Sequence, residues 1–275
     1  MFKFASCDGC QLSLLDAEDQ LLDLSGAFDI RYFPEASSRM LRGPYDIALV
    51  EGSITTHADA DRIHKVRRLA RTLIALGACA TSGGIQSLRN WQDVGAMVRA
   101  VYPTPGYIAT LATSTPISDH VPVDVELRGC PISKDLLLET LAALLAGRRP
   151  NLPAYSVCIE CKRRGQVCLL VGADEPCLGP VTQAGCGAIC PGFGRGCYGC
   201  FGPMESANVT ALVAGLRERG LHGDVIVRLL RGFNAWSWPF RSGGDEAARA
   251  AAADEAAGDG PTGGGATAPA GGGAR

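Results

Sequence analysis

The sequence predicts an α/β protein in which a doubly wound parallel sheet is followed by an irregular, cysteine-rich domain. Strand-like and helix-like segments alternate over residues 1–150, and strands that are separated by helices usually pair in parallel. Residues 151–202 then carry eight of the twelve cysteines, together with many glycines and prolines that leave little room for regular structure. Something other than an apolar core must organise this second part.

Strands of the first domain are expected where short apolar runs occur. These runs lie at residues 2–5, 29–33, 46–50, 72–76 and 123–127. Helices are expected between them, at residues 12–24, 58–71, 88–101 and 133–145. The second of these helices places Ile63, Val66 and Ala70 on one face, and Ser133 is suited to cap the last helix.

The chain after the cysteine-rich segment is expected to hold one further helix, at residues 206–217, and an apolar stretch up to Phe240. Past Ser242 the chain is mostly Gly, Ala and Pro, a composition that buries too little surface to offset the entropy cost of ordering. The expected organisation is a first domain at 1–150, a second at 151–241, and a disordered Gly/Ala-rich tail at 242–275 in which residues 245–257 could form a transient helix.

Composition and charge exclude several functions. A net charge of −2 gives no reason to expect nucleic-acid binding, which normally needs a basic excess. No run approaches the ~20 apolar residues that cross a bilayer, and the first residues resemble neither a secretion signal nor a twin-arginine leader. We therefore expect a cytoplasmic protein without a direct membrane span, whose reducing surroundings keep its cysteines as free thiols. Metal binding is the leading interpretation of so many thiols.

Four of the cysteines follow predicted strands. Cys7 and Cys10 follow the first strand, and Cys79 and Cys130 come just after the strands at 72–76 and 123–127. Because parallel strands end at the same edge of a sheet, these thiols should converge there. Four thiolates suit a tetrahedral zinc or a [4Fe–4S] cluster, and ligands so widely spaced along the chain fit a cluster better than a zinc ribbon. Glycines in these loops would let backbone amides approach cluster sulfides.

The other eight cysteines divide less clearly. They fall into two series of four, first Cys158, Cys161, Cys168 and Cys177, then Cys186, Cys190, Cys197 and Cys200. Taken alone, this spacing leaves two zinc ribbons as an open alternative to two further clusters.

Six short motifs together resemble the small, electron-transferring subunit of [NiFe] hydrogenases. They are "SCDGCQ", "VEGSI", "GACATSGG", "RGCP", "CLGPVTQAGC" and "GCYGC", and they occur in this order between Phe2 and Pro203. The likeness is greatest for the cytoplasmic sulfhydrogenase delta type within the NADH:ubiquinone oxidoreductase 20 kDa subunit-like family. Each motif alone is weak evidence, whereas six in the right order are specific.

The resemblance implies three [4Fe–4S] clusters with cysteine ligands only. A proximal cluster would take Cys7, Cys10, Cys79 and Cys130, a distal cluster Cys158, Cys161, Cys168 and Cys177, and a medial cluster Cys186, Cys190, Cys197 and Cys200. Cys158 stands where periplasmic relatives carry a histidine, and Cys190 stands where many relatives carry a proline and hold a three-iron cluster. Both departures should favour lower reduction potentials.

The same resemblance implies the function. Electrons from H2, cleaved at a nickel–iron centre in a separate large subunit, would pass through the clusters to an iron–sulfur subunit and a flavoprotein that reduces NAD(P)+. The chain would thus be an electron carrier within an H2:NAD(P)+ oxidoreductase, with a flavodoxin-like domain, an iron–sulfur domain and no catalytic residue of its own. A zinc-stabilised interaction module and a complex I-type quinone-reductase subunit with a single cluster remain alternatives. Glu51, after the 46–50 strand, could contact a partner subunit, relay protons or bind local amides.

Overall fold

A parallel sheet forms the first part of the computed structural model, which describes residues 1–20 and 26–256. Within these ranges its four strands are β1 (Phe2–Lys3), β2 (Tyr45–Glu51), β3 (Ala70–Leu76) and β4 (Val125–Leu127), and they pair in the order β1-β2-β3-β4. All three pairings are parallel, with Val50 opposite Phe2 and Ala75, and Leu76 opposite Leu127. The predicted parallel sheet is therefore confirmed.

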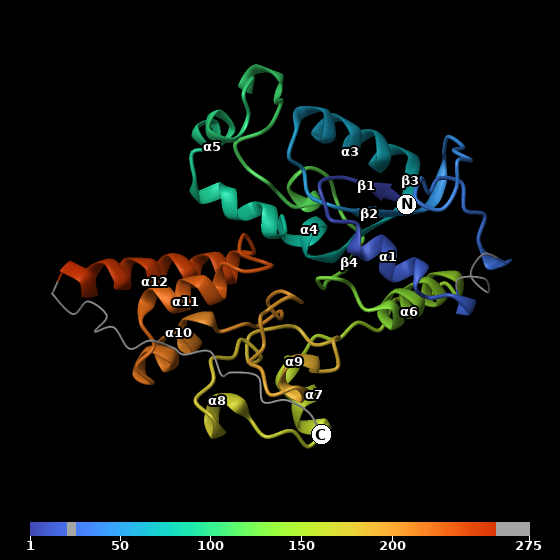
Figure 1. The fold of residues 1–275 in the computed structure, drawn as a ribbon. Coiled ribbons are helices and arrows are strands. Elements are labelled where there is room, and N and C mark those ends of the chain that lie inside the picture. Colours follow the sequence, from blue (N-terminus) through green and yellow to red (C-terminus); the bar gives the residue numbers. More distant parts are fainter. Residues whose placement is uncertain (21–25, 257–275) are drawn as a thin grey trace, which may run out of the picture.

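Helices cover both faces of this sheet (Figure 1). Ile63 and Val66 of α3 (His57–Leu69) pack with Val50 and Leu73 on one face. On the other face α1 (Gly9–Leu15) and α6 (Lys134–Leu145) pack against the alternate strand residues, among them Ile74, Leu76 and Leu127. This alternation of burial along β3 follows from the two-residue period of a strand, and the arrangement is doubly wound as predicted.

The segment 29–33, predicted as a strand, does not form one. Tyr32 makes a single isolated bridge to Met40, and its carbonyl accepts a 2.6 Å hydrogen bond from the Met1 amino group beside β1. Ile30 is 40% exposed and Pro34, which has no N–H to donate, follows directly. The segment thus lies next to β1 with too few buried residues and donors for a ladder.

Two predicted helices have different bounds in the structure. The helix expected at 12–24 begins earlier, as α1 from Gly9, and residues 21–25 of that prediction lie outside the described ranges. The helix expected at 88–101 is divided into a 3-10 helix, η1 (Ile85–Trp91), and α5 (Val94–Val101). Asp93 causes the division, because its side chain accepts a 3.0 Å hydrogen bond from the Ala96 amide and so starts a new helix.

Other helix boundaries follow their capping residues. Ser133 caps α6 through the Leu136 amide as predicted, and Thr56 caps α3 through the Asp59 amide. Two short 3-10 helices, η2 (Pro105–Tyr107) and η3 (Ile117–Asp119), and helix α4 (Gly77–Ser82), which follows β3, complete the first part of the chain.

The second part begins with an irregular segment that contains three short helices. These are α7 (Val157–Arg163), α8 (Leu169–Gly172) and α9 (Ile189–Gly192). Three longer helices follow and pack together: α10 (Val209–Glu218), α11 (Gly223–Leu230) and α12 (Trp238–Ala256). They lie side by side in Figure 1, apart from the sheet, with the irregular segment below them. None of the described helices has the length and apolar character that crossing a membrane requires.

Helix α12 corrects the prediction that a disordered tail begins at residue 242. The helix continues to Ala256, and residues 257–275 lie outside the described ranges. Its small residues are packed rather than free: a Cβ at Gly243 would overlap the Val209 side chain, and one at Gly223 of α11 would lie 2.8 Å from the Cβ of Ala251. The glycine and alanine residues that suggested disorder in the sequence instead let the three helices approach closely.

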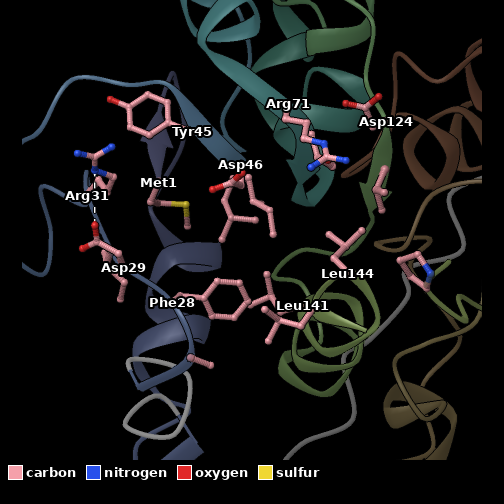
Figure 2. A pocket seen from close by; sticks show the side chains of 18 of the residues that line it. Met1, Phe28, Asp29, Arg31, Tyr45, Asp46, Arg71, Asp124, Leu141 and Leu144 are labelled. Carbon is pink, nitrogen blue, oxygen red and sulfur yellow. Dashed lines mark ion pairs between the residues drawn. The ribbon is translucent and has the colours of Figure 1, made fainter. Parts of the chain in front are cut away.

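A cavity of about 1360 Å³ lies at the amino-terminal edge of the sheet, between α1 and α6 (Figure 2). Met1, Phe28 and Leu141 form part of its apolar wall, and Asp46 and Arg71 are among its charged groups. The cysteines, which all lie in described ranges, are absent from its lining, and the first four of them follow strands at the opposite edge of the sheet.

Candidate functional site

The first four cysteines lie in loops at the carboxyl edge of the sheet. Cys7 and Cys10 come after β1, with Cys10 inside α1, whereas Cys79 lies in α4 directly after β3 and Cys130 comes after β4. Cys10 is buried, Cys79 and Cys130 are partly buried, and Cys7 is exposed. The sheet therefore places all four at one edge, as the strand pattern predicts.

Electrostatic effects show that these four thiols form one group. Burial raises the pKa of Cys79 to about 11, and the nearby thiols of Cys130 and Cys7 add to this rise. Burial also raises the pKa of Cys10, and Glu51, Cys79 and Cys130 raise it further. Buried thiols whose pKa values are raised in this way would be costly as thiolates unless a bound cation compensated them, so the group suits a metal cluster.

Glycines leave room for the sulfur atoms of this group. Gly77 has a φ of +79°, and a Cβ there would overlap Sγ of Cys10. Gly84 has a φ of +65°, and a Cβ there would lie 2.7 Å from Sγ of Cys79. Both the backbone conformation and the space thus require glycine, as in loops where the main chain approaches a bound group.

The second group is formed by Cys158 and Cys161 of α7, Cys168 before α8, and Cys177. Burial raises the pKa of Cys161 to about 11, and the thiols of Cys158, Cys177 and Cys168 each raise it further. Cys177 is buried, whereas Cys168 is exposed. A Cβ at Gly179 would lie 3.3 Å from Sγ of Cys177 and 3.6 Å from Sγ of Cys158, so this glycine borders two thiols of one group.

The third group contains Cys186, Cys190 of α9, Cys197 and Cys200. Burial raises the pKa of Cys200 to about 12, and the thiols of Cys186 and Cys190 add to the rise. Burial raises the pKa of Cys197 to about 12 as well. The thiol of Cys200 adds to this rise, whereas a hydrogen bond from the Gly199 amide lowers the pKa. Cys200 is therefore electrostatically linked to each of the other three.

The third group lies between the other two. Among the effects on the pKa of Cys200, after burial and its own group, is the thiol of Cys130 from the first group. The pKa of Cys197 is raised by burial and also by Cys177 of the second group, whose Sγ accepts a 3.2 Å hydrogen bond from the Cys197 amide. The three groups thus form a row: first, third, second.

Glu160 is a site residue that the sequence analysis missed. Its Oε1 accepts a 2.9 Å hydrogen bond from the Gly185 amide and its Oε2 a 3.1 Å bond from the Ala188 amide, on either side of Cys186. It holds the loop of the third group from a helix of the second. Its position between the two cysteines of "CIEC" was the available signal.

Glu51 lies beside the first group. It is only 2% exposed, and its Oε1 accepts a 3.1 Å hydrogen bond from the Cys10 amide. Burial raises the pKa of Glu51, which the Cys10 amide opposes. The contact seen is thus the local amide, one of the three roles considered for this carboxylate.

In the described ranges, no three His, Cys, Asp or Glu side chains are drawn together closely enough to hold a single metal ion. Each group of four nevertheless has donors of one kind, thiols, which are the ligands of iron–sulfur clusters. A doubly wound sheet with one such group at its carboxyl edge, and two more in a row beyond it, suits the class of iron–sulfur electron-transfer proteins.

Comparison with known proteins gives the family. The family model described as "NADH ubiquinone oxidoreductase, 20 Kd subunit" matches residues 7–144. Sulfhydrogenase 2 subunit delta of Pyrococcus furiosus is 38% identical over 237 residues, which cover 86% of this chain and 98% of that protein. The chain therefore belongs to this family, and it is an electron-transfer small subunit of a [NiFe] hydrogenase.

Solved structures agree with this. A structure of NAD+-reducing [NiFe]-hydrogenase in the H2-reduced state has a chain that is 30% identical, with a TM-score of 0.51, over 55% of this chain and 92% of that one. The [NiFeSe]-hydrogenase of Dm. baculatum, 17% identical with a TM-score of 0.50 over 74% of this chain and 94% of that one, shares the fold. An α/β sheet followed by a helical carboxyl-terminal region is thus common to hydrogenase small subunits and this chain.

Proposed function

We propose that this chain binds three [4Fe–4S] clusters and carries electrons between the nickel–iron centre of a large subunit and an NAD(P)-linked diaphorase module. The observation that carries the proposal is the row of three thiol groups, in which Cys200 adjoins Cys130 at one end and Cys197 adjoins Cys177 at the other. The proposal of clusters in series requires such contiguity.

The ligand sets follow the three groups. Cys7, Cys10, Cys79 and Cys130 would hold the proximal cluster, Cys186, Cys190, Cys197 and Cys200 the medial cluster, and Cys158, Cys161, Cys168 and Cys177 the distal cluster. The proximal set belongs to the domain proposed at 1–150, and the others to the domain at 151–241. When bound, each cluster would accept and release one electron.

Exposure suggests where electrons enter and leave. Cys7 is exposed at the first group and Cys168 is exposed at the second, whereas no cysteine of the central group is exposed. A large subunit covering the first group and an electron partner covering the second would each come close to one end of the row.

The electron partner is proposed to be an iron–sulfur subunit together with a flavin- and NAD(P)-binding subunit, in the cytoplasm. Two relatives support this assignment: a sulfhydrogenase subunit and a chain of an NAD+-reducing hydrogenase. All-cysteine ligation agrees with it, because thiolates in place of a neutral histidine favour the low potentials at which a nicotinamide exchanges electrons.

Iron analysis of this chain, produced without its partner subunits and purified without air, tests the cluster assignment. We expect about twelve irons per chain and visible absorption that dithionite bleaches, since three four-iron clusters account for all twelve cysteines. About four irons would indicate the single cluster of a complex I-type subunit. A colourless protein with about three zinc ions and no iron would indicate the zinc-stabilised module, and either result would contradict the proposal.

Purification through a tag on this chain tests the partners. We expect a nickel-containing large subunit and flavin-containing subunits to co-purify, and the complex to reduce NAD+ or NADP+ with H2. Recovery of the large subunit without any flavoprotein would contradict the diaphorase assignment while leaving the hydrogenase family unchanged.

A further inference from the structure

A buried asparagine joins the loops of the first and third thiol groups. Asn234, between α11 and α12, is 2% exposed. Its Nδ2 donates to the carbonyls of Gly199 and Cys200, at 2.9 Å each, and its Oδ1 accepts a 2.7 Å hydrogen bond from Oγ of Ser82. One side chain therefore contacts both loops.

These three hydrogen bonds fix the orientation of the amide. Nδ2 carries two hydrogens, and both point at carbonyl oxygens, which leaves Oδ1 for the Ser82 hydroxyl. A flipped amide would place its oxygen against the two carbonyls, so the assignment is determined by the partners. An asparagine satisfies all of them, whereas an aspartate or a leucine of similar size does not.

Each partner of Asn234 is close to a cysteine ligand of the proposed clusters. Ser82 ends α4, the helix that carries Cys79, and it too is buried, at 2% exposure. The Gly199 and Cys200 carbonyls belong to the ligand loop of the third group. Asn234 thus links the helix of a first-group ligand to the main chain of a third-group ligand.

The neighbouring chain is shaped around this side chain. Gly202 has a φ of +71°, and a Cβ there would lie 3.2 Å from Oδ1 of Asn234. On the other side, Arg128 donates to the Pro203 carbonyl, and a Cβ at Gly129 would lie 3.0 Å from the Phe201 ring. The two loops therefore meet closely, with Asn234 hydrogen-bonded within their junction.

We propose that Asn234 is a positioning residue that fixes the separation between the proximal and medial clusters and thereby sets the rate of electron exchange between them. This inference rests on the proposed function, because it concerns two of the three clusters. Asn234 ligates no iron. It acts through the Ser82 hydroxyl and the Cys200 main chain, so its removal loosens the junction without removing a ligand.

The test compares three variants of the complete complex, prepared without air. Asn234→Ala removes the whole link. Ser82→Ala removes its connection to α4, together with the 2.8 Å contact of the Ser82 hydroxyl with the Ala78 carbonyl. Asn208→Ala is the control, because Asn208 caps α10 through the Ala211 amide. Iron content, the magnetic interaction between reduced clusters in electron paramagnetic resonance, and the rate at which H2 reduces the medial cluster are measured for each.

We expect full iron content in all three variants. Asn234→Ala and Ser82→Ala should both weaken the magnetic interaction and slow reduction of the medial cluster several-fold, whereas Asn208→Ala should match the wild type. Because both substitutions break one link, the double variant should be no slower than Asn234→Ala. A merely structural role would change thermal stability but leave the magnetic interaction unaltered.

An unchanged magnetic interaction and reduction rate in Asn234→Ala with full iron content would overturn the inference and leave the proposed function intact. If Asn234→Ala does not assemble, Ser82→Ala decides in the same way: a weakened interaction supports the inference and an unchanged one overturns it. A wild-type complex without iron would overturn both the inference and the proposed function.

Discussion

Cys190 lies in the first turn of the short helix α9, directly before Pro191. A proline is tolerated at such a position, because the first amides of a helix have no partner within it. Cys190→Pro should therefore remove a ligand of the proposed medial cluster without unfolding the helix. We expect the loss of about one iron per chain and the resonance signal of an oxidised three-iron cluster.

Phe193→Ala is the control for this change, since Phe193 lies at the end of the same helix and is 83% exposed. It should retain the full iron content. If Cys190→Pro also retained every iron, Cys190 would not be a ligand and the four-cysteine medial set would be wrong.

A second prediction at the scale of one residue concerns the carboxyl group of Asp124. Burial raises the pKa of this carboxyl group, but the Leu73 amide and the Arg67 guanidinium outweigh burial and hold the pKa below its usual value. The carboxylate accepts a 2.7 Å hydrogen bond from the Leu73 amide and a 2.6 Å bond from Arg67. A lowered pKa means that the ionised form stabilises the fold above the unfolded-state pKa, near 4, and that this contribution is lost as pH falls through the folded-state value.

Asp124→Asn should therefore weaken the local structure at neutral pH by about 1 kcal/mol, a modest value because the carboxylate is partly exposed to solvent. Hydrogen exchange at the Leu73 amide should be about fivefold faster in the variant, and the difference should shrink on acidification. A difference that grew on acidification would contradict the sign of the pKa shift.

Particular residues show which parts of the site could be predicted from the sequence. The cysteines and the cap at Ser133 carry local signals, so they could be predicted. Glu160 had a signal in its position between two cysteines, but Asn234 had none, because its partners Ser82 and Cys200 come from distant parts of the chain. A residue that acts by joining distant loops cannot be found by local pattern.

At the scale of elements, helix α12 depends on the close packing of small residues, and this leads to a further prediction. Gly243→Ala would bring a Cβ into the Val209 side chain of α10, so the substitution should lower the free energy of unfolding of the helical region by about 1–3 kcal/mol. Gly215→Ala is the matched control, because a Cβ at Gly215 of α10 meets nothing within 4 Å. It should be neutral or stabilise by up to about 1 kcal/mol.

Thermal unfolding of the two variants provides the measurement. The melting temperature should fall for Gly243→Ala and hold or rise for Gly215→Ala. Equal melting temperatures would indicate that α12 does not pack on α10 and would favour a disordered tail from residue 242.

The irregular segment between α6 and α10 gives a prediction on metal removal. Its helices α7, α8 and α9 are short. Its small buried cluster consists of Cys177, Cys197, Val157 and Ala188, and two further cysteines, Cys161 and Cys186, pack against it. Chelation of iron under denaturant-free conditions should therefore release hydrogen-exchange protection in this segment, whereas β2 and β3 keep theirs. Retained protection in α7 and α9 after complete iron removal would contradict a cluster-supported fold.

Elements with strong apolar patterns were predictable, and the exceptions have physical causes. β2, β3 and α6 follow continuous apolar runs or a capped helical period. The prediction of a strand at 29–33 was wrong because an apolar run forms a strand only where neighbours bury it, and Ile30 remains exposed. The prediction of disorder over α12 was wrong because composition alone cannot distinguish small residues that pack from small residues that do not.

At the scale of the whole molecule, the order of the three thiol groups differs from their order along the chain. The group at Cys186–Cys200 comes last in sequence but lies between the other two. Spacing along the chain did not show which cysteines belong to this group or where the group lies. Only the resemblance to hydrogenase subunits suggested both. The fold supplies the physical reason, because the loop around Cys200 returns to the sheet edge beside Cys130.

The iron positions in a crystal of the complex, located by anomalous scattering at the iron absorption edge, test the account most directly. Within this chain we expect three separate iron clusters in a row, the middle one bound by Cys186, Cys190, Cys197 and Cys200 and flanked by the other two. A single cluster beside Cys7 and Cys10, or zinc in place of iron at the remaining eight cysteines, would contradict it.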